Sequence, residues 1–310
     1  MSMRKHILIL FVLLSMVITG CGNQEISKDD GKIHIVATTT MLADAVKIIG
    51  ADQVQVEGLM GPGIDPHLYK ASAGDVEKMN QAELVIYNGL HLEGKMGEIF
   101  ENMEKQNKRI LEIGKGLPKD QLIEAESSPG NYDPHIWFNV ELWIKAVEEI
   151  EKTLSNFDKE HAALYKENTK NYVNELKELH EYVQKRVEEV PKEKRVLITA
   201  HDAFNYFGDR YGFQVKGLQG LSTATEAGTA DVKNLADYIA ENKIPAIFVE
   251  SSVPVKNIKA LQDAVAARDF KVEIGGELFS DSLGDPHSEE GTYIGTVKHN
   301  INTIVDALIK

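Results

Sequence analysis

The chain has 310 residues, of which 43% are hydrophobic, so it is long enough for two domains with substantial cores. Its 34 Lys and Arg stand against 48 Asp and Glu, a net charge of −14, and such an acidic surface repels nucleic acid and anionic lipid. The chain has one cysteine, which excludes an internal disulfide and a metal site built from several thiolates.

The N-terminus has the pattern of a secretion signal. Two basic residues precede an apolar run from Ile7 to Ile18, which is shorter than the about 20 residues that a transmembrane helix needs. The run ends in Ile18-Thr19-Gly20-Cys21, which resembles a bacterial lipobox, where the cysteine takes a diacylglyceryl group and becomes the new N-terminus. We therefore expect a cleaved signal peptide over residues 1–20, a lipid anchor at Cys21 and a flexible polar tether over 21–31.

Beyond the tether, short β-rich runs alternate with helical patterns, which is typical of βαβ units and a mainly parallel sheet. Strands are predicted at 33–38, 54–59, 84–87, 196–199, 214–218, 246–249 and 271–274. Helices are predicted at 41–49, from about 72, from near 140, and at 203–211, 229–242 and 293–308.

Between 158 and 190 the pattern changes to that of one long helix, which Pro191 ends. A largely apolar stripe recurs at steps of three and four, while Lys and Glu fill the other faces. The stripe comprises Tyr165, Thr169, Tyr172, Leu176, Leu179, Val183, Val187 and Val190. At a rise of ~1.5 Å per residue such a helix spans about 50 Å, which is longer than one small domain needs.

The predicted fold class is therefore α/β, with two lobes that each contain a mainly parallel sheet flanked by helices. One long rigid helix joins the lobes. We expect the N-terminal lobe over 32–156, the linking helix over 157–191 and the C-terminal lobe over 192–310.

Three of the ten histidines share one context. His67, His135 and His201 each come just beyond a predicted strand and at the start of a predicted helix. Loops past the carboxyl ends of parallel strands are where open α/β sheets gather ligands, so three imidazoles placed there can converge. The first two lie in the sequence Asp-Pro-His, in which the proline restrains the loop that presents the imidazole.

A borderline cation also favours an oxygen donor, and Asp281 lies in the corresponding loop of the last unit of the second lobe. Three histidines and one aspartate, two from each lobe, would hold an ion in the cleft between the lobes. Because protein would then supply all four ligands, such a site suits binding and not catalysis.

Other histidines fit this pattern less well. A third Asp-Pro-His ends at His287, but Glu289 and Glu290 crowd it as in an exposed loop, which disfavours it as a ligand. His91 also follows a predicted strand, and we expect it in the wall or the second shell of the site.

The leader, the lipobox and five segments together resemble the manganese- and zinc-binding lipoproteins of ABC importers, in the MntA/TroA branch. The segments are 60–69, 88–94, 133–138, 199–204 and 217–223. The resemblance covers the whole mature chain. It implies a lipid-anchored monomer on the outer face of the bacterial cell membrane, with limited hinge motion and with metal held by residues His67, His135, His201 and Asp281. It also implies an ABC permease with its cytoplasmic ATPase as the partner.

The resemblance bears on the metal in two opposed ways. Zinc-dedicated relatives often carry a His-rich loop before the second ligand, and the region from Lys115 to Tyr132 has no histidine, which favours manganese. Many manganese-specific members have Glu at the third ligand position, where this chain has His201, and the extra nitrogen suits zinc. The predicted ligand is a divalent metal ion, with Mn2+ favoured and Zn2+ possible.

Besides a zinc-preferring receptor, two other functions are open. A secreted zinc hydrolase would need an open coordination position and a general base, but the sequence has no His-Glu-x-x-His and the fourth ligand would fill that position. A surface adhesin is a role described for relatives, although no residue here argues for it. We therefore expect a receptor and not an enzyme.

Overall fold

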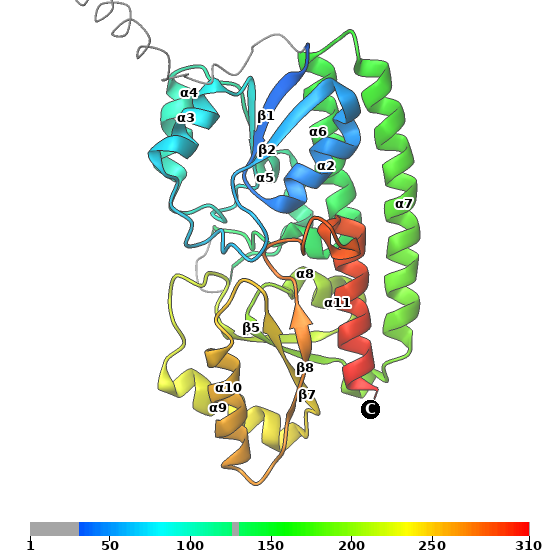
Figure 1. Cartoon of the computed structure of the whole chain (residues 1–310). Coiled ribbons are helices and arrows are strands. Elements are labelled where there is room, and N and C mark those ends of the chain that lie inside the picture. Colours follow the sequence, from blue (N-terminus) through cyan, green and yellow to red (C-terminus); the bar gives the residue numbers. More distant parts are fainter. Residues whose placement is uncertain (1–30, 126–129, 310) are drawn as a thin grey trace, which may run out of the picture. The chain divides into compact units, whose positions relative to one another are not determined.

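The computed structural model describes residues 31–125 and 130–309 of the chain. The predicted signal peptide, Cys21 and nearly all of the predicted tether lie outside these residues. From Ile33 onward the described residues form one unit. Figure 1 shows two α/β lobes that lie along one side of a long helix, α7 (Ala162–Glu188).

The N-terminal lobe contains a parallel sheet with the strand order β2-β1-β3-β4. In β1, Ile35 packs with helices α2 and α6, whereas Val36 faces the opposite side, with α3 and α4. Helices therefore cover both faces, which explains the continuous apolar strands. The elements are β1 (Ile33–Ala37), α2 (Thr40–Gly50), β2 (Val54–Gly58), α3 (Ala73–Gln81), β3 (Leu84–Tyr87), α4 (Gly97–Lys105), β4 (Ile110–Glu112), α5 (Ile113–Gly116) and α6 (Val140–Phe157).

The C-terminal lobe contains two parallel strand pairs, β5 with β6 and β7 with β8, and β5 lies beside β7. Ile198 and Ile247 pack against α9 and α10, whereas Phe248 and Leu278 belong to the core that α11 shares with α7. The elements are β5 (Val196–His201), α8 (Asn205–Tyr211), β6 (Gln214–Gln219), α9 (Thr229–Asn242), β7 (Ala246–Glu250), α10 (Lys256–Ala266), β8 (Glu273–Leu278) and α11 (Tyr293–Leu308). Short 3-10 helices are η2 (Ala51–Gln53), η3 (Lys119–Gln121), η4 (Ile136–Phe138), η5 (Lys192–Lys194) and η6 (Glu289–Gly291).

The predicted stripe is buried from Tyr165 to Val190, although α7 itself ends at Glu188. The helix contacts α2 and α6 of the first lobe and α11 of the second. One rigid element thus spans both lobes. The helix begins at Ala162 and not at Asp158, because the Asp158 carboxylate accepts the backbone N–H groups of Glu160 and His161 in the turn between α6 and α7.

The prediction of the last strand is wrong in its position. The strand was expected at 271–274, but β8 begins at Glu273 and continues through Gly275 and Gly276 to Leu278. Glycines are depleted in strands, so the Gly275-Gly276 pair argued against a strand at this position. At Gly275 a Cβ would lie 2.7 Å from the Phe248 ring, so close packing against β7 requires glycine there. Helices α4 and α10 and strand β4 were also not predicted.

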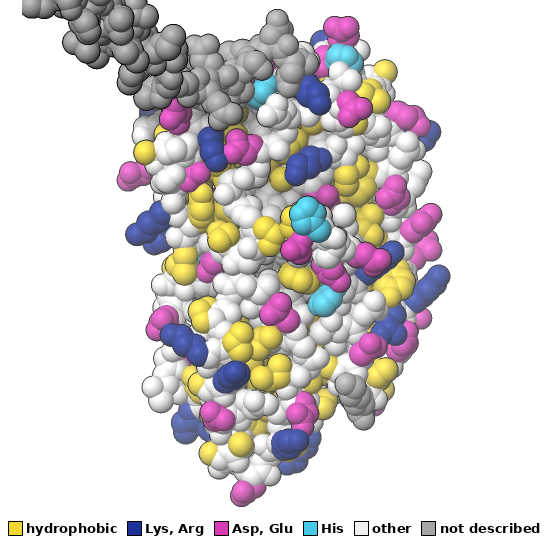
Figure 2. Space-filling view, in the orientation of Figure 1, with side chains coloured by type: hydrophobic (Ala, Val, Ile, Leu, Met, Phe, Trp, Pro, Cys, Tyr) yellow, Lys and Arg dark blue, Asp and Glu magenta, His cyan; other side chains and the backbone are white. Residues whose placement is uncertain are grey.

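Charged side chains of both signs lie on the face of the molecule seen in Figure 2. On the face seen in Figure 2, Asp and Glu are interspersed with Lys and Arg, and neither sign forms a continuous patch. This distribution fits the role of charge in solubility.

Candidate metal centre

Four buried side chains from the two lobes meet at one point. His67, His135, His201 and Asp281 are 4%, 0%, 0% and 2% exposed, and each offers a ligand atom within 4.8 Å of the others. These are the four residues that the sequence singled out. The structure therefore brings together three imidazoles and one carboxylate that lie up to 214 positions apart, the separation of residues 67 and 281.

The donor atoms face one another at short range. The Nε2 atoms of His67 and His135 are 3.2 Å apart, and Asp281 lies 3.6 Å from His135 Nε2 and 3.4 Å from His201 Nε2. His201 Nε2 and Asp281 Oδ1 are buried and have no hydrogen-bond partner among the described residues. A buried polar atom without a partner costs about 1–3 kcal/mol, and a cation bound between these atoms would satisfy both. The site therefore fits a metal ion.

The Asp-Pro-His segments form one recurring turn. The Asp65 carboxylate accepts the backbone N–H of His67 at 2.8 Å, and the Asp133 carboxylate accepts that of His135 at 2.9 Å. This Asx turn fixes the backbone that presents each imidazole. His287 lies in the same turn, but it is exposed and does not join the group of four.

The strand context predicted for the histidines holds only in part. His67 follows β2, although α3 begins only at Ala73, and His201 is the last residue of β5. No parallel strand directly precedes His135 among the described residues, where Glu124 and Tyr132 form an isolated antiparallel bridge. Convergence therefore depends on tertiary packing and not on three equivalent loops.

Two buried carboxylates hold two of the imidazoles from behind. Asp133 lies 2.7 Å from His135 Nδ1, and Glu250 lies 2.5 Å from His201 Nδ1. Glu250 also accepts the backbone N–H groups of Ala200 and His201. Since each Nδ1 donates to a carboxylate, each Nε2 is left to face an ion. This role of Glu250 was not predicted from the sequence; its position at the end of β7, beside β5, is the signal that could have found it.

The charges of the group suit a divalent ion. Mainly burial, with His135 and His201 adding to it against Asp281, lowers the pKa of His67 to about 3, so this imidazole is neutral at pH 7. Burial raises the pKa of Asp281, but the neighbouring histidines outweigh it and hold that pKa below its ordinary range. Burial lowers the pKa of His201, but Glu250 and Asp281 outweigh it and raise that pKa.

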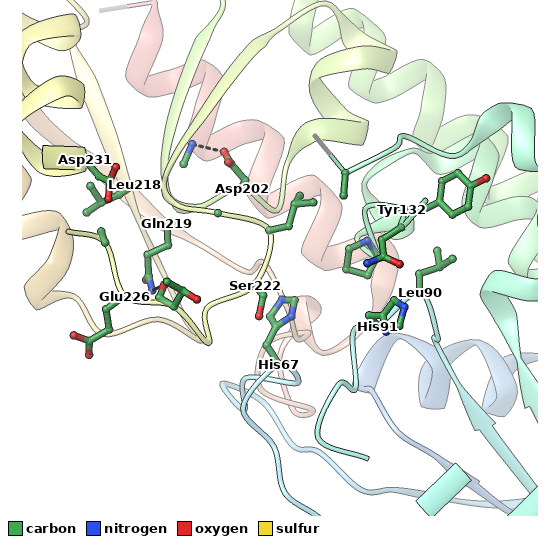
Figure 3. A pocket seen from close by; sticks show the side chains of 18 residues that line it. His67, Leu90, His91, Tyr132, Asp202, Leu218, Gln219, Ser222, Glu226 and Asp231 are labelled. Atoms are coloured by element: carbon green, nitrogen blue, oxygen red, sulfur yellow. Dashed lines mark hydrogen bonds between the residues drawn. The ribbon is translucent and has the colours of Figure 1, made fainter. Parts of the chain in front are cut away.

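A cavity of about 610 Å³ adjoins the group. Its wall includes His67, together with Pro134 and Asp202, which are the sequence neighbours of the other two histidines. Figure 3 shows His67 between the loop that follows β6 on one side and His91 on the other. Among the described residues no Lys or Arg lines the cavity, so a cation that enters the cavity meets no Lys or Arg charge in its wall. His91 is exposed here, and its role in the second shell stays a prediction.

A donor set supplied wholly by protein and buried between two α/β lobes is the arrangement of a metal-ion binding protein. The family model described as "ZnuA: Zinc-uptake complex component A periplasmic" matches residues 35–307. The chain belongs to this family, whose members are the metal-binding components of ABC importers.

Two relatives match over nearly their whole length. The chain is 48% identical over 302 residues to the zinc-binding protein TroA of Treponema pallidum, covering 96% of this chain and 97% of that one. It is 45% identical over 307 residues to the manganese-binding lipoprotein MntA of Bacillus subtilis, covering 99% and 100%. The solved structure of the periplasmic zinc binding protein TroA from Treponema pallidum matches with a TM-score of 0.87 and 49% identity, over 90% of this chain and 99% of that one.

Both relatives are named as metal-binding proteins, and MntA also as a lipoprotein, so the chain stands among receptors and not among enzymes. Among the described residues, no helix combines the length and the apolar character needed to cross a membrane.

Proposed function

We propose that the chain is a lipid-anchored, monomeric receptor outside the cytoplasm that binds one divalent transition metal and delivers it to an ABC permease. His67, His135, His201 and Asp281 are the ligands, and manganese is favoured over zinc as the cargo. The observation that carries the proposal is the buried group of three imidazoles and one carboxylate, in which two polar atoms lack partners. The two lobes each supply two ligands, so separating them would release the ion.

The observations that bear on manganese and zinc oppose one another. Three imidazole nitrogens favour zinc, and manganese stands at the weak end of the Irving–Williams order for any such site. The absence of histidine between Lys115 and Tyr132 favours manganese. TroA, named for zinc, and MntA, named for manganese, are 48% and 45% identical to the chain, so they support both ions about equally. We expect both to bind, zinc more tightly, and manganese to be the ion delivered.

We predict that protein purified without chelators binds one equivalent of metal, and that zinc displaces manganese in a competition titration. Calorimetry gives the stoichiometry and the two Kd values. Uptake of radioactive manganese and zinc, measured in cells with and without the gene, identifies the ion delivered. A loss of zinc uptake alone on deletion would favour the zinc-preferring alternative, and the absence of bound metal would remove the receptor proposal altogether.

The lipid anchor has its own test. Cys21→Ser removes the only thiol that can carry the lipid, so we expect the protein to move from the membrane fraction to the medium. Asn23→Ser, two positions further on, is the matched control and should stay with the membrane. Fractionation followed by immunoblotting measures both. Retention of the Cys21→Ser protein in washed membranes would show that something other than this cysteine holds it there.

The alternatives have less support. A hydrolase would need an open coordination position on the metal for water, and here a fourth protein side chain would fill that position. Adhesion has no residue or surface that argues for it, and it would be supported if an Asp281→Ala variant with an intact fold lost surface attachment.

A further inference from the structure

The loop that carries His67 is tied to the other lobe at two points. The backbone N–H of Gly63 donates to Ser282 Oγ at 2.8 Å, and the Thr223 hydroxyl donates to Asp65 Oδ2 at 2.5 Å. The other oxygen of the Asp65 carboxylate accepts the backbone N–H of His67. One carboxylate therefore connects the backbone of a proposed metal ligand to a loop of the opposite lobe.

Thr223 differs from the rest of its loop. It is 7% exposed, whereas Ser222, Ala224 and Thr225 beside it are exposed to solvent. Its hydroxyl turns inward from this exposed loop and donates to the Asp65 carboxylate of the opposite lobe.

The same loop forms one wall of the cavity beside the metal centre. Ser222 and Thr225 line that cavity together with His67, as Figure 3 shows for Ser222 and His67. The bond between Thr223 and Asp65 therefore holds the cavity wall against the loop that presents His67. Breaking this bond would let the wall move away from His67 and open the way between the ion and the cavity.

We propose that the hydrogen bond between Thr223 and Asp65 is an interlobe clasp that sets how long the metal stays bound. This inference rests on the proposed function. Thr223 acts as a positioning residue, because it touches no ligand atom and works through Asp65 on the loop of His67. The ion leaves only when the lobes part at this wall, and the clasp has to break first. Loss of the clasp thus accelerates dissociation.

The test compares three variants of the full chain loaded with Zn2+ and mixed rapidly with an excess of a fluorescent zinc chelator. Thr223→Val keeps the shape of the side chain and removes the donor, and we expect zinc to dissociate about tenfold faster. Thr223→Ser keeps the hydroxyl and should restore a rate close to that of the wild type. Ala224→Val, in the same loop, is exposed and is not among the residues that line the cavity, so it is the matched control and should leave the rate unchanged.

The backbone of the loop does not depend on the clasp, because the Gln219 amide donates to the carbonyls of Thr223 and Thr225. The melting temperature of the metal-free variants should therefore stay near that of the wild type. Asp65→Asn changes the other partner of the hydrogen bond with Thr223. The asparagine side chain still has an oxygen that can accept the His67 N–H. In the double variant with Thr223→Val, we expect dissociation no faster than in the faster single variant.

A wild-type dissociation rate in Thr223→Val would overturn the clasp, and so would an equal acceleration in Ala224→Val. In both cases the wild type still binds zinc and the receptor proposal stands. If the wild type itself binds no metal, the proposed function fails and the clasp fails with it.

Discussion

Replacing His67 with alanine is expected to weaken metal binding by at least about a thousandfold and to abolish the rise in melting temperature that metal produces. The imidazole is one of the four buried side chains that we propose as ligands, and its loss would leave the ion with three protein donors and open toward the cavity. A ligand present at 100 times its Kd stabilises the native state by about 2.7 kcal/mol, so loss of binding removes this increment. Thermal scans with and without metal, and direct titration, measure both effects.

The chain supplies a matched control for this experiment. His287 lies in the same Asp-Pro-His turn, with its backbone N–H on Asp285 at 2.8 Å, but its side chain is exposed. His287→Ala should leave both the Kd and the thermal shift unchanged. A normal thermal shift in His67→Ala would remove His67 from the site, whatever the control shows.

The second large effect is expected at Glu250, which is not one of the four proposed ligands. Glu250→Gln keeps the size of the side chain, but its amide group has to face at least one of the three N–H groups that the carboxylate now accepts. The His201 ring then loses part of what orients it, and replacing such outer partners of a ligand typically costs 10–100-fold in metal affinity. We expect a loss of about that size, measured as the Kd for Zn2+ against a competing chelator.

Glu277→Gln is the control for Glu250→Gln. Glu277 lies on the adjacent strand β8, opposite Val249, and is exposed, so its charge should not matter for affinity. The absorption spectrum of the cobalt-loaded protein should change in Glu250→Gln and not in Glu277→Gln, because only the former reorients a ligand. An unchanged Kd and an unchanged spectrum in Glu250→Gln would contradict the positioning role.

The architecture also indicates how far the lobes can move. Helix α7 contacts α2 and α6 in one lobe and α11 in the other, so large rotations would expose buried side chains such as Leu176. Small displacements at the mouth of the site are less costly, because hydrogen bonds near the ligands can break singly. We therefore expect contacts such as that between Thr223 and Asp65 to matter more for metal release than a large hinge motion of the lobes.

Several elements could be read from local sequence. Strand β3, helix α9 and helix α11 lie at the bounds expected, because their apolar spacing and their flanking residues agree. The apolar stripe of α7 could be predicted for the same reason, because its residues recur at steps of three and four. Strand β8 was misplaced, because its Gly275-Gly276 pair serves close packing with β7 rather than strand propensity.

In the metal centre, too, the local sequence predicts some features and only the packing of the lobes decides others. Local sequence sufficed to choose the four residues that the structure brings together and to predict a constrained turn at His67 and His135, since the side-chain chemistry and the Asp-Pro-His segments are local properties. Only the packing of the lobes decided that Glu250 lies behind His201, 49 positions away, and that Thr223 reaches Asp65 across 158 positions. Such contacts depend on how strands and loops remote in the chain are placed side by side, and no periodicity within a segment encodes them.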